Sequence, residues 1–158
     1  MPQRKKTQGF SLIELLIVVT IIGIIAAIAI PNLLASRRAA NEASAISGIR
    51  SISTTQFSYQ ASVGAGFYAA SLSILGNNGF IDTQLATGSK SGYSYSTVAN
   101  SVEPAAFIAS CKPTVDSGVT RTGERQFETD QPGVVYANPG TTAMASTVRS
   151  ATGTAIGN

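Results

Sequence analysis

One carboxylate, Glu14, lies inside a long apolar stretch near the start of the chain. Residues 10–30 contain only four positions that are not clearly apolar, namely Ser11, Glu14, Thr20 and Gly23. A charged side chain near the middle of a bilayer costs about 2.5–3.5 kcal/mol on insertion scales, so a carboxylate within such a stretch indicates a function. Glu14 therefore needs a partner that compensates its charge. The chemistry to expect here is charge pairing.

Composition excludes most familiar catalytic sites. The chain has no His and a single Cys, Cys111, so it holds no His-based metal site, Ser-His-Asp triad, Cys-His dyad or intrachain disulfide. Charged residues make up 12%, about half the usual share, which predicts a surface that faces lipid or other subunits. With 158 residues the chain has room for one globular unit and a short additional segment, so a two-domain enzyme is not expected.

The net charge of +3 comes from the N-terminal tip. Arg4, Lys5 and Lys6 account for it, and the rest of the chain carries equal numbers of basic and acidic side chains. Phosphate binding needs clustered cations, and beyond the tip only Arg37 and Arg38 are adjacent. We therefore expect no intrinsic nucleic-acid binding.

The apolar stretch is long enough to cross a membrane. As a helix, residues 10–30 would span roughly 31 Å, the thickness of the hydrocarbon core. The cations that precede it favour an N-terminus held in the cytoplasm. An alternative is a cleavable secretory signal with its cleavage site at Ala27-Ile28-Ala29, but the length of the stretch and the carboxylate within it argue against that.

The combination of these features resembles a known family. RKKTQG at residues 4–9 followed by FSLIELLIVV at residues 10–19 is similar to the leader and N-terminus of type IV pilins and type II secretion pseudopilins. The resemblance implies cleavage after Gly9 by a prepilin peptidase and N-methylation of Phe10. In a stack of subunits, the Glu14 carboxylate of an incoming chain would pair with the terminal amine of a docked chain, and this pair would set the axial register. The alternative is that Glu14 pairs with the amine of its own chain.

Two further residues match the family pattern and affect helix flexibility. Pro31 lacks an N–H and crowds the carbonyl of Ala27, and Gly23 lowers helical preference by about 1 kcal/mol relative to Ala. The segment between them is expected to loosen in the filament, although Pro31 could also be an ordinary membrane-helix proline.

The remaining chain predicts an α+β fold, a long helix packed on a small antiparallel sheet. The predicted boundaries are a leader at 1–9, a membrane and assembly helix at 10–30, its amphipathic half at 31–60, a globular head at 61–136 and a tail at 137–158. Ile46, Ile49, Ile52 and Tyr59 form a helical stripe that needs a cover. Arg38 and Glu42 are four residues apart and are interpreted as a solvated surface pair.

Short elements are expected within the head. Helical turns are predicted at 71–75 and 82–86, and strands at 93–98, 105–111, 125–129 and 134–137. Pro132 and Gly133 are expected at the centre of a type II turn that joins the last two strands. Residues 126–135 also resemble the closing hairpin of major pseudopilins and of some short pilins. In the tail, 15 of 22 residues are Ala, Gly, Ser or Thr, so little core is expected there and a mobile, glycan-bearing or subunit-contacting strip is predicted.

No cofactor or metal site is predicted. Major pseudopilins bind calcium near this hairpin, and the possible oxygen donors here are Asp116, Glu124, Glu128 and Asp130. Their spacing does not match a known ligand pattern, so scattered solvated acids are the preferred interpretation. Cys111 alternates with Phe107 and Ala109 on one face of a predicted strand, which indicates a buried structural thiol.

Three functions remain open. The preferred function is a structural subunit of a type IV pilus for motility, adhesion or DNA uptake, polymerised from the bacterial inner membrane. The second is the major pseudopilin of a type II secretion system, in a periplasmic filament. The third is a membrane-anchored binding protein or enzyme. The expected partners are identical subunits in a helical homopolymer, inner-membrane lipid, the prepilin peptidase and methyltransferase, and a pilus or secretion assembly platform.

Overall fold

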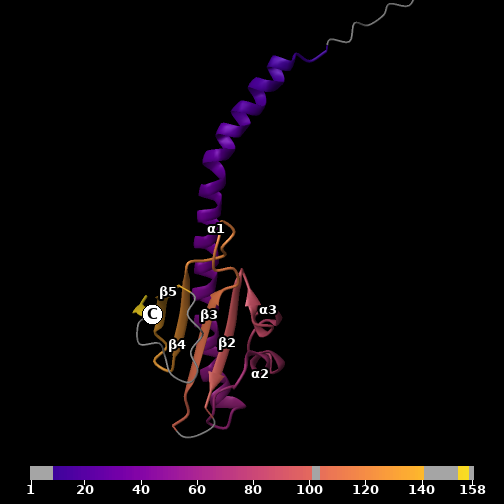
Figure 1. Ribbon diagram of the computed structural model, residues 1–158. Coiled ribbons are helices and arrows are strands. Elements are labelled where there is room, and N and C mark those ends of the chain that lie inside the picture. Colours follow the sequence, from indigo (N-terminus) through magenta and orange to yellow (C-terminus); the bar gives the residue numbers. More distant parts are fainter. Residues whose placement is uncertain (1–8, 101–103, 141–152, 157–158) are drawn as a thin grey trace, which may run out of the picture. The chain divides into compact units, whose positions relative to one another are not determined.

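The computed structural model describes residues 9–100, 104–140 and 153–156. The cationic leader residues and most of the tail therefore lie outside the described residues. The chain divides into two units, Met1–Ala35 and Ser36–Asn158. Helix α1 (Leu12–Ser62) provides the described structure of the first unit from Leu12 onward, and it continues into the second unit as its central element (Figure 1).

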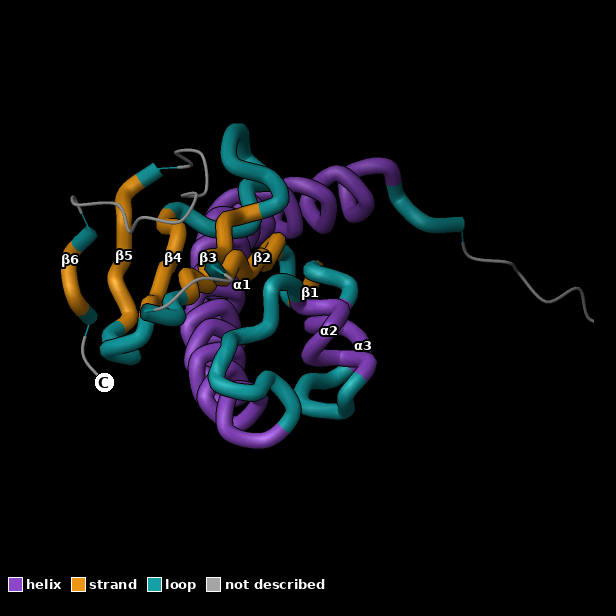
Figure 2. Tube along the Cα trace, turned by 90° about the horizontal axis from the view of Figure 1, so that it is seen from below, coloured by secondary structure: helices purple, strands orange, loops and turns teal. Residues whose placement is uncertain are grey.

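The second unit is a six-stranded antiparallel sheet packed against α1. The strands are β1 (Ser89–Lys90), β2 (Tyr93–Ala99), β3 (Phe107–Pro113), β4 (Arg125–Asp130), β5 (Val135–Pro139) and β6 (Thr154–Ala155), and they follow one another in chain order across the sheet. Two short helices, α2 (Leu72–Asn77) and α3 (Thr83–Ala86), lie beside the β1 edge (Figure 2). The predicted α+β class is confirmed.

The sheet covers the apolar stripe of α1, as predicted. Ile49 and Ile52 are fully buried, and Ile46 and Tyr59 pack at the edge of the same core. On the sheet side, the core receives alternate residues of the strands, namely Tyr93, Tyr95, Phe107, Ala109, Cys111, Phe127, Val135 and Ala137. Helix and sheet approach closely at Gly48, where an added Cβ would lie 2.8 Å from Cε1 of Tyr95. The absence of a side chain at Gly48 makes room for that ring.

The two short helices were predicted with small boundary differences. Asp82 precedes α3 in an extended conformation, and its side chain accepts a hydrogen bond from the backbone N–H of Leu85 at 2.8 Å. This is an ordinary N-cap. Leu75 and Leu85 are buried, so each helix contributes an apolar anchor to the core.

Strand β3 begins two residues later than the sequence predicted. The side-chain oxygen of Asn100 accepts a hydrogen bond from the N–H of Ala106 at 2.7 Å, which holds Ala106 in the β2–β3 connection. The strand then extends to Pro113, which pairs with Tyr93.

The β4–β5 hairpin is present, but its turn lies one residue earlier than predicted. The N–H of Gly133 donates to the carbonyl of Asp130 at 2.9 Å, so the central residues are Gln131 and Pro132. Gly133 follows the turn with φ 74°, a left-handed conformation that glycine adopts without strain. The predicted type II placement of Pro132 and Gly133 is therefore wrong.

The sheet extends into the segment that the sequence assigned to the tail. β5 continues through Ala137 and Asn138, both buried, and the two-residue strand β6 pairs with β5 at Tyr136 and Ala137. Ile156 packs against the core. More of the core therefore forms after residue 136 than the composition of this segment predicted. Composition alone does not show that a short edge strand pairs with its neighbour.

Candidate functional site

The N-terminal end of α1 presents the residues that the sequence singled out. Gly9 and Phe10 precede the helix and are exposed, with Phe10 at 75%. An added Cβ at Gly9 would meet nothing within 4 Å. The Gly9–Phe10 peptide bond is thus sterically open within the described part of the chain.

Glu14 is placed where it stabilises the start of the helix. One of its carboxylate oxygens accepts a hydrogen bond from the backbone N–H of Ser11 at 3.0 Å. A Ser followed three residues later by Glu is the arrangement of a capping box, in which the carboxylate satisfies a backbone donor at the first turn. The negative charge is also favourable at the positive end of the helix dipole. The carboxylate remains exposed, so it can also bind a cationic partner.

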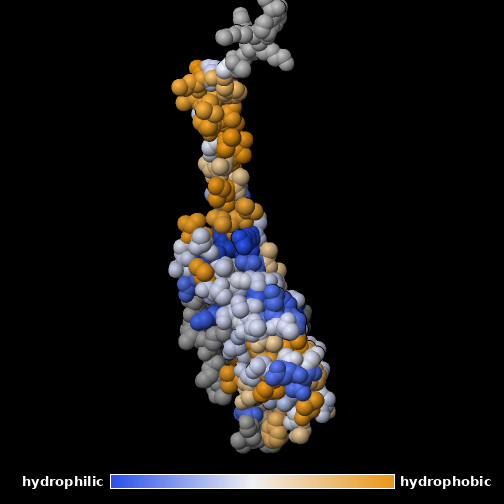
Figure 3. Space-filling model, turned by 90° about the vertical axis from the view of Figure 1, so that its right-hand side faces the viewer, coloured by the Kyte–Doolittle hydropathy of each residue, from blue (hydrophilic) through white to orange (hydrophobic). Residues whose placement is uncertain are grey.

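The surface that follows Glu14 is apolar on every side. Every Phe, Leu, Ile and Val side chain in residues 10–30 is exposed, from 46% at Val18 to 82% at Leu12. In Figure 3 this segment of the first unit is coloured almost uniformly as hydrophobic. Helix α1 is long and apolar enough to cross a membrane. The hydroxyl of Thr20 donates to the carbonyl of Leu16 at 2.7 Å, so this polar group is satisfied within the helix, as a lipid environment requires.

Helix α1 is continuous through Gly23 and Pro31, and both residues are exposed. An added Cβ at Gly23 would meet nothing within 4 Å, so no contact within the chain requires glycine there. Loosening of the helix between the two residues stays a prediction.

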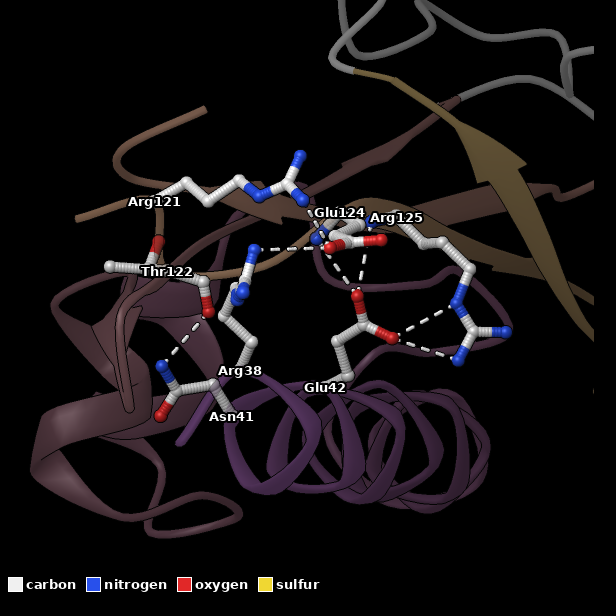
Figure 4. A network of polar contacts seen from close by, with 7 residues as sticks. All are labelled: Arg38, Asn41, Glu42, Arg121, Thr122, Glu124 and Arg125. Carbon is white, nitrogen blue, oxygen red and sulfur yellow. Dashed lines mark hydrogen bonds and ion pairs between the residues drawn. The ribbon is translucent and has the colours of Figure 1, made fainter. Parts of the chain in front are cut away.

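A second polar site, in the second unit, joins α1 to the start of β4 (Figure 4). Glu42 is buried, and its carboxylate accepts hydrogen bonds from the backbone N–H groups of Glu124 and Arg125, at 2.8 and 3.2 Å. The Arg125 guanidinium adds two contacts, through Nε at 2.9 Å and Nη2 at 2.8 Å. Asn41 donates to the carbonyl of Thr122 at 2.9 Å. These contacts fix the connection between β3 and β4 on the helix.

The interpretation of Arg38 and Glu42 as a solvated surface pair is wrong. Arg38 forms an ion pair with Glu124 at 3.2 Å, and Glu42 is buried against Arg125. The sequence does contain a signal for the burial of Glu42. Glu42 and Gln56 lie at the two ends of the buried face of α1, which includes Ala45, Ile49 and Ile52 at helical spacing. A polar residue on an apolar stripe needs a buried partner, because its desolvation is otherwise uncompensated.

Gln56 meets that requirement in the same way. Its amide accepts from the N–H of Ala69 at 2.8 Å and donates to the carbonyl of Ala69 at 2.9 Å and to Oγ1 of Thr97 at 3.0 Å. Glu42 and Gln56 are therefore positioning residues for the loops that flank the sheet.

The four acids considered as calcium ligands do not act as one set. Glu124 is paired with Arg38 and Arg121, Glu128 is buried and accepts from Asn138 at 3.0 Å, and Asp116 is exposed. Among the described residues, no three acidic or cysteine side chains gather as metal ligands. The interpretation of Glu128 as a solvated acid is corrected by its burial.

Cys111 is fully buried in the core, as predicted. Burial raises the pKa of its thiol far above the ordinary value, because the thiolate would be desolvated. The thiol is a packing group and not a nucleophile.

Comparison with known proteins bears on the N-terminal segment. Residues 4–30 match the family model of the prokaryotic N-terminal methylation motif. A stretch of 38 residues is 60% identical to the major component of the Thermus thermophilus type IV wide pilus, covering 24% of this chain and 29% of that protein. A stretch of 54 residues is 44% identical to the type IV major pilin of Myxococcus xanthus, covering 34% of this chain and 24% of that protein.

The N-terminal segment matches the prokaryotic N-terminal methylation motif and is similar to the N-terminal parts of type IV pilins. A third relative, the type II secretion system core protein G of Aeromonas hydrophila, is 36% identical over 47 residues, which cover 30% of this chain and 33% of that protein. The chain spans a quarter to a third of the length of these relatives. No solved structure gives a significant match.

The pilin-type segment contains four of the residues chosen from the sequence, Gly9, Phe10, Glu14 and Gly23, within the matched range, and Pro31 directly follows it. Glu42, Asn41 and Arg125 lie outside the motif. These three residues lie in parts of the chain that the methylation motif does not cover.

Proposed function

We propose that this protein is a structural subunit of a type IV pilus. The observation that carries the proposal is the exposure of the whole apolar surface of residues 10–30 in a segment that matches the methylation motif. A bare apolar helix of this length does not remain in water, so it needs either lipid or a bundle of similar helices. A filament core of identical helices meets that need once the subunit leaves the membrane.

The subunit is made as a precursor in the inner membrane, with its N-terminus in the cytoplasm. Prepilin peptidase cleaves after Gly9, and the new terminal amine of Phe10 is methylated. That amine is a cation at the edge of lipid, one helical turn from Glu14. The Glu14 carboxylate of an incoming subunit pairs with the amine of a docked subunit, which relieves two desolvated charges together. Gly23 and Pro31 allow the segment between them to adjust during packing.

The role is structural and not enzymatic. The partners are identical subunits in a helical homopolymer, inner-membrane lipid before assembly, the peptidase and methyltransferase, and the assembly platform. Motility, adhesion or DNA uptake would be functions of the assembled filament. Outside the cationic leader the chain has balanced charge, which limits long-range repulsion between stacked copies.

The primary experiment is to shear cells at native expression and examine the released fraction. We expect long fibres in which this chain dominates by mass, and intact-mass analysis should give a mature chain that begins at methylated Phe10. A mature chain that begins after Ala29 would establish a secretory signal and remove the filament assignment.

Replacing Glu14 by Ala tests the charge pairing. We expect a processed, membrane-resident protein whose sheared filament falls by more than about tenfold, because the amine of the docked subunit is left without its counter-ion. Thr20→Val is the matched control, since it removes the neighbouring polar group whose hydroxyl bonds only to Leu16 of its own helix. Normal filament from the Glu14 variant would show that apolar packing alone sets the stack.

A second candidate function is the major pseudopilin of a type II secretion system. The specific observations in its favour are the similarity to core protein G and the β4–β5 hairpin, whose residues resemble the closing hairpin of major pseudopilins. Under this alternative, sheared fibres are absent and deletion of the gene leaves exoproteins trapped in the periplasm. The same two measurements therefore separate the candidates.

A further inference from the structure

An exposed loop between β3 and β4 presents apolar side chains to solvent. Val119 is 76% exposed and Val115 is 41% exposed, and Asp116 between them is exposed as well. We define residues 115–119 as the knob. The knob is held at its base, since Thr122 N–H donates to the Val115 carbonyl at 2.9 Å and Val115 N–H donates to Thr122 Oγ1 at 3.2 Å.

The same base is attached to the helix. Asn41 donates to the carbonyl of Thr122 at 2.9 Å, and Thr114 N–H donates to the carbonyl of Gly92 at 3.0 Å. The base of the knob is therefore held in place, which lowers the conformational entropy that is lost when the knob binds a partner.

A groove of about 290 Å³ lies farther along α1, between the helix and the β4–β5 turn. Its lining consists of one face of the helix and two turn residues, namely Arg50, Ser53, Thr54, Phe57, Pro132 and Gly133. Phe57 is 39% exposed, and its ring is held edge-on by Tyr68 and Phe107, with centroids 5.9 and 5.8 Å away. The apolar wall of the groove is thus rigid and partly open to solvent.

Knob and groove are complementary in charge and polarity. The knob offers two valines and one carboxylate, whereas the groove offers an exposed arginine beside Phe57 and Pro132. We propose that the knob of one subunit docks in the groove of a second copy of this chain, with Val119 against Phe57 and Pro132 and Asp116 paired with Arg50. This contact rests on the proposed filament function and specifies which surfaces of the second unit carry it.

The positions of the two surfaces predict an open stack. The knob is anchored at Asn41, and the groove centres on Thr54, so they are separated by roughly 20 Å along the helix axis at 1.5 Å per residue. One copy must be displaced along that axis to bring its knob to the other's groove. Because the two surfaces are different, each subunit still has one knob or groove unused, and the contact propagates without closing.

Cysteine cross-linking in assembled filaments tests the contact. Val119→Cys combined with Thr54→Cys places thiols on two exposed positions, and Cys111 does not interfere because it is buried. Mild oxidation, or a short bismaleimide, should give a ladder of dimers, trimers and longer species in sheared fibres. The control combines Val119→Cys with Val98→Cys on β2, an exposed position on the sheet face away from α1, and should give no ladder.

Four outcomes would overturn the contact. Fibres without a ladder, or an equal ladder from the Val98 control, would refute the docking of knob and groove while leaving the pilus assignment intact. If the thiol introduced by Val119→Cys is shielded from maleimide in the membrane pool but reactive in fibres, the knob belongs to a lipid surface. Absence of fibres from the unmodified chain would refute the proposed function itself, and this contact with it.

Charge reversal gives a second, independent measure. Asp116→Arg or Arg50→Asp alone should lower the amount of sheared filament by about two- to fivefold, the range of an exposed ion pair. The double variant should restore it. The matched control is Asp116→Arg with Arg37→Asp, which reverses another exposed arginine of α1 and should not restore assembly. Equal rescue by both double variants would show that only net charge matters and would refute the pairing.

Discussion

Replacing Glu42 with Ala removes the carboxylate that joins α1 to the start of β4. In the native structure this carboxylate accepts two backbone hydrogen bonds, from Glu124 and Arg125, and two from the Arg125 guanidinium, all between 2.8 and 3.2 Å. The Glu42 side chain is 11% exposed and that of Arg125 is 47% exposed. After the substitution, water can solvate the guanidinium but reaches the backbone N–H groups less easily.

The expected loss of unfolding free energy is about 2–3 kcal/mol. Removing one partner of a buried ion pair costs about 3–5 kcal/mol, and the half-exposed arginine brings the value below that range. Glu42→Gln keeps an oxygen for the two backbone donors and loses only the charge, so about 1 kcal/mol is expected. Arg38→Ala removes an exposed ion pair with the half-exposed Glu124, which Arg121 still pairs, so less than about 1 kcal/mol is expected.

Urea unfolding of the full chain in detergent micelles measures these differences. The chain has no Trp, and its five Tyr residues all lie in the second unit, so the near-UV circular dichroism of tyrosine reports on that unit and not on the membrane helix. With a slope of about 1–3 kcal/mol per molar urea, Glu42→Ala should lower the midpoint by about 0.7–3 M. A midpoint no lower than that of Arg38→Ala would refute the view that the buried carboxylate holds helix and sheet together.

The other predictions concern the buried phenol and thiol groups. Tyr93→Phe should lower the unfolding free energy by about 1 kcal/mol in the same urea assay, because the Tyr93 hydroxyl donates to the carbonyl of Arg125 at 2.8 Å. Tyr95→Phe should be neutral or stabilising, because the buried Tyr95 hydroxyl has no hydrogen-bond partner in the described structure. Equal losses from both variants would contradict this. Cys111 should resist iodoacetamide in the folded protein and react fully in urea, as followed by intact mass; rapid native alkylation would show that the core opens readily. Burial raises the pKa of Cys111, Tyr93 and Tyr95, because their ionised forms would be desolvated in the folded protein. Their contribution to the free energy of unfolding is complete below the ordinary pKa values of 9.0 for Cys and 10.0 for Tyr. It is lost as the pH rises from these values toward the raised pKa values of the folded protein. The urea midpoint should therefore decrease as the pH is raised above 9. In Cys111→Ala the part of this decrease that begins at the lowest pH should be smaller. A midpoint that stays constant up to pH 11 would contradict this prediction.

Several features follow from short-range patterns in the sequence. The predominantly apolar residues at 10–30 specify an exposed membrane-length helix, and Ser11 and Glu14 specify how its first turn is capped. The stripe at Ile49 and Ile52 specifies which face of α1 is buried. These features depend on residues three or four apart, whose relation is set by helix geometry alone.

Other features are determined only when distant segments meet. Glu42 is 83 residues from Arg125 in the sequence. The nearby Arg38, four residues away, was therefore interpreted as its partner. The turn at Gln131 and Pro132, the start of β3 and the pairing of β6 with β5 likewise depend on hydrogen bonds between strands and loops. A buried carboxylate is stable only where several hydrogen-bond donors compensate its desolvation, and such a site exists only after the chain has folded. Helical spacing places Glu42 on the same face as Ala45 and Ile49, although it was interpreted as a solvated residue, and only tertiary packing provides Arg125 and the two backbone donors that stabilise it.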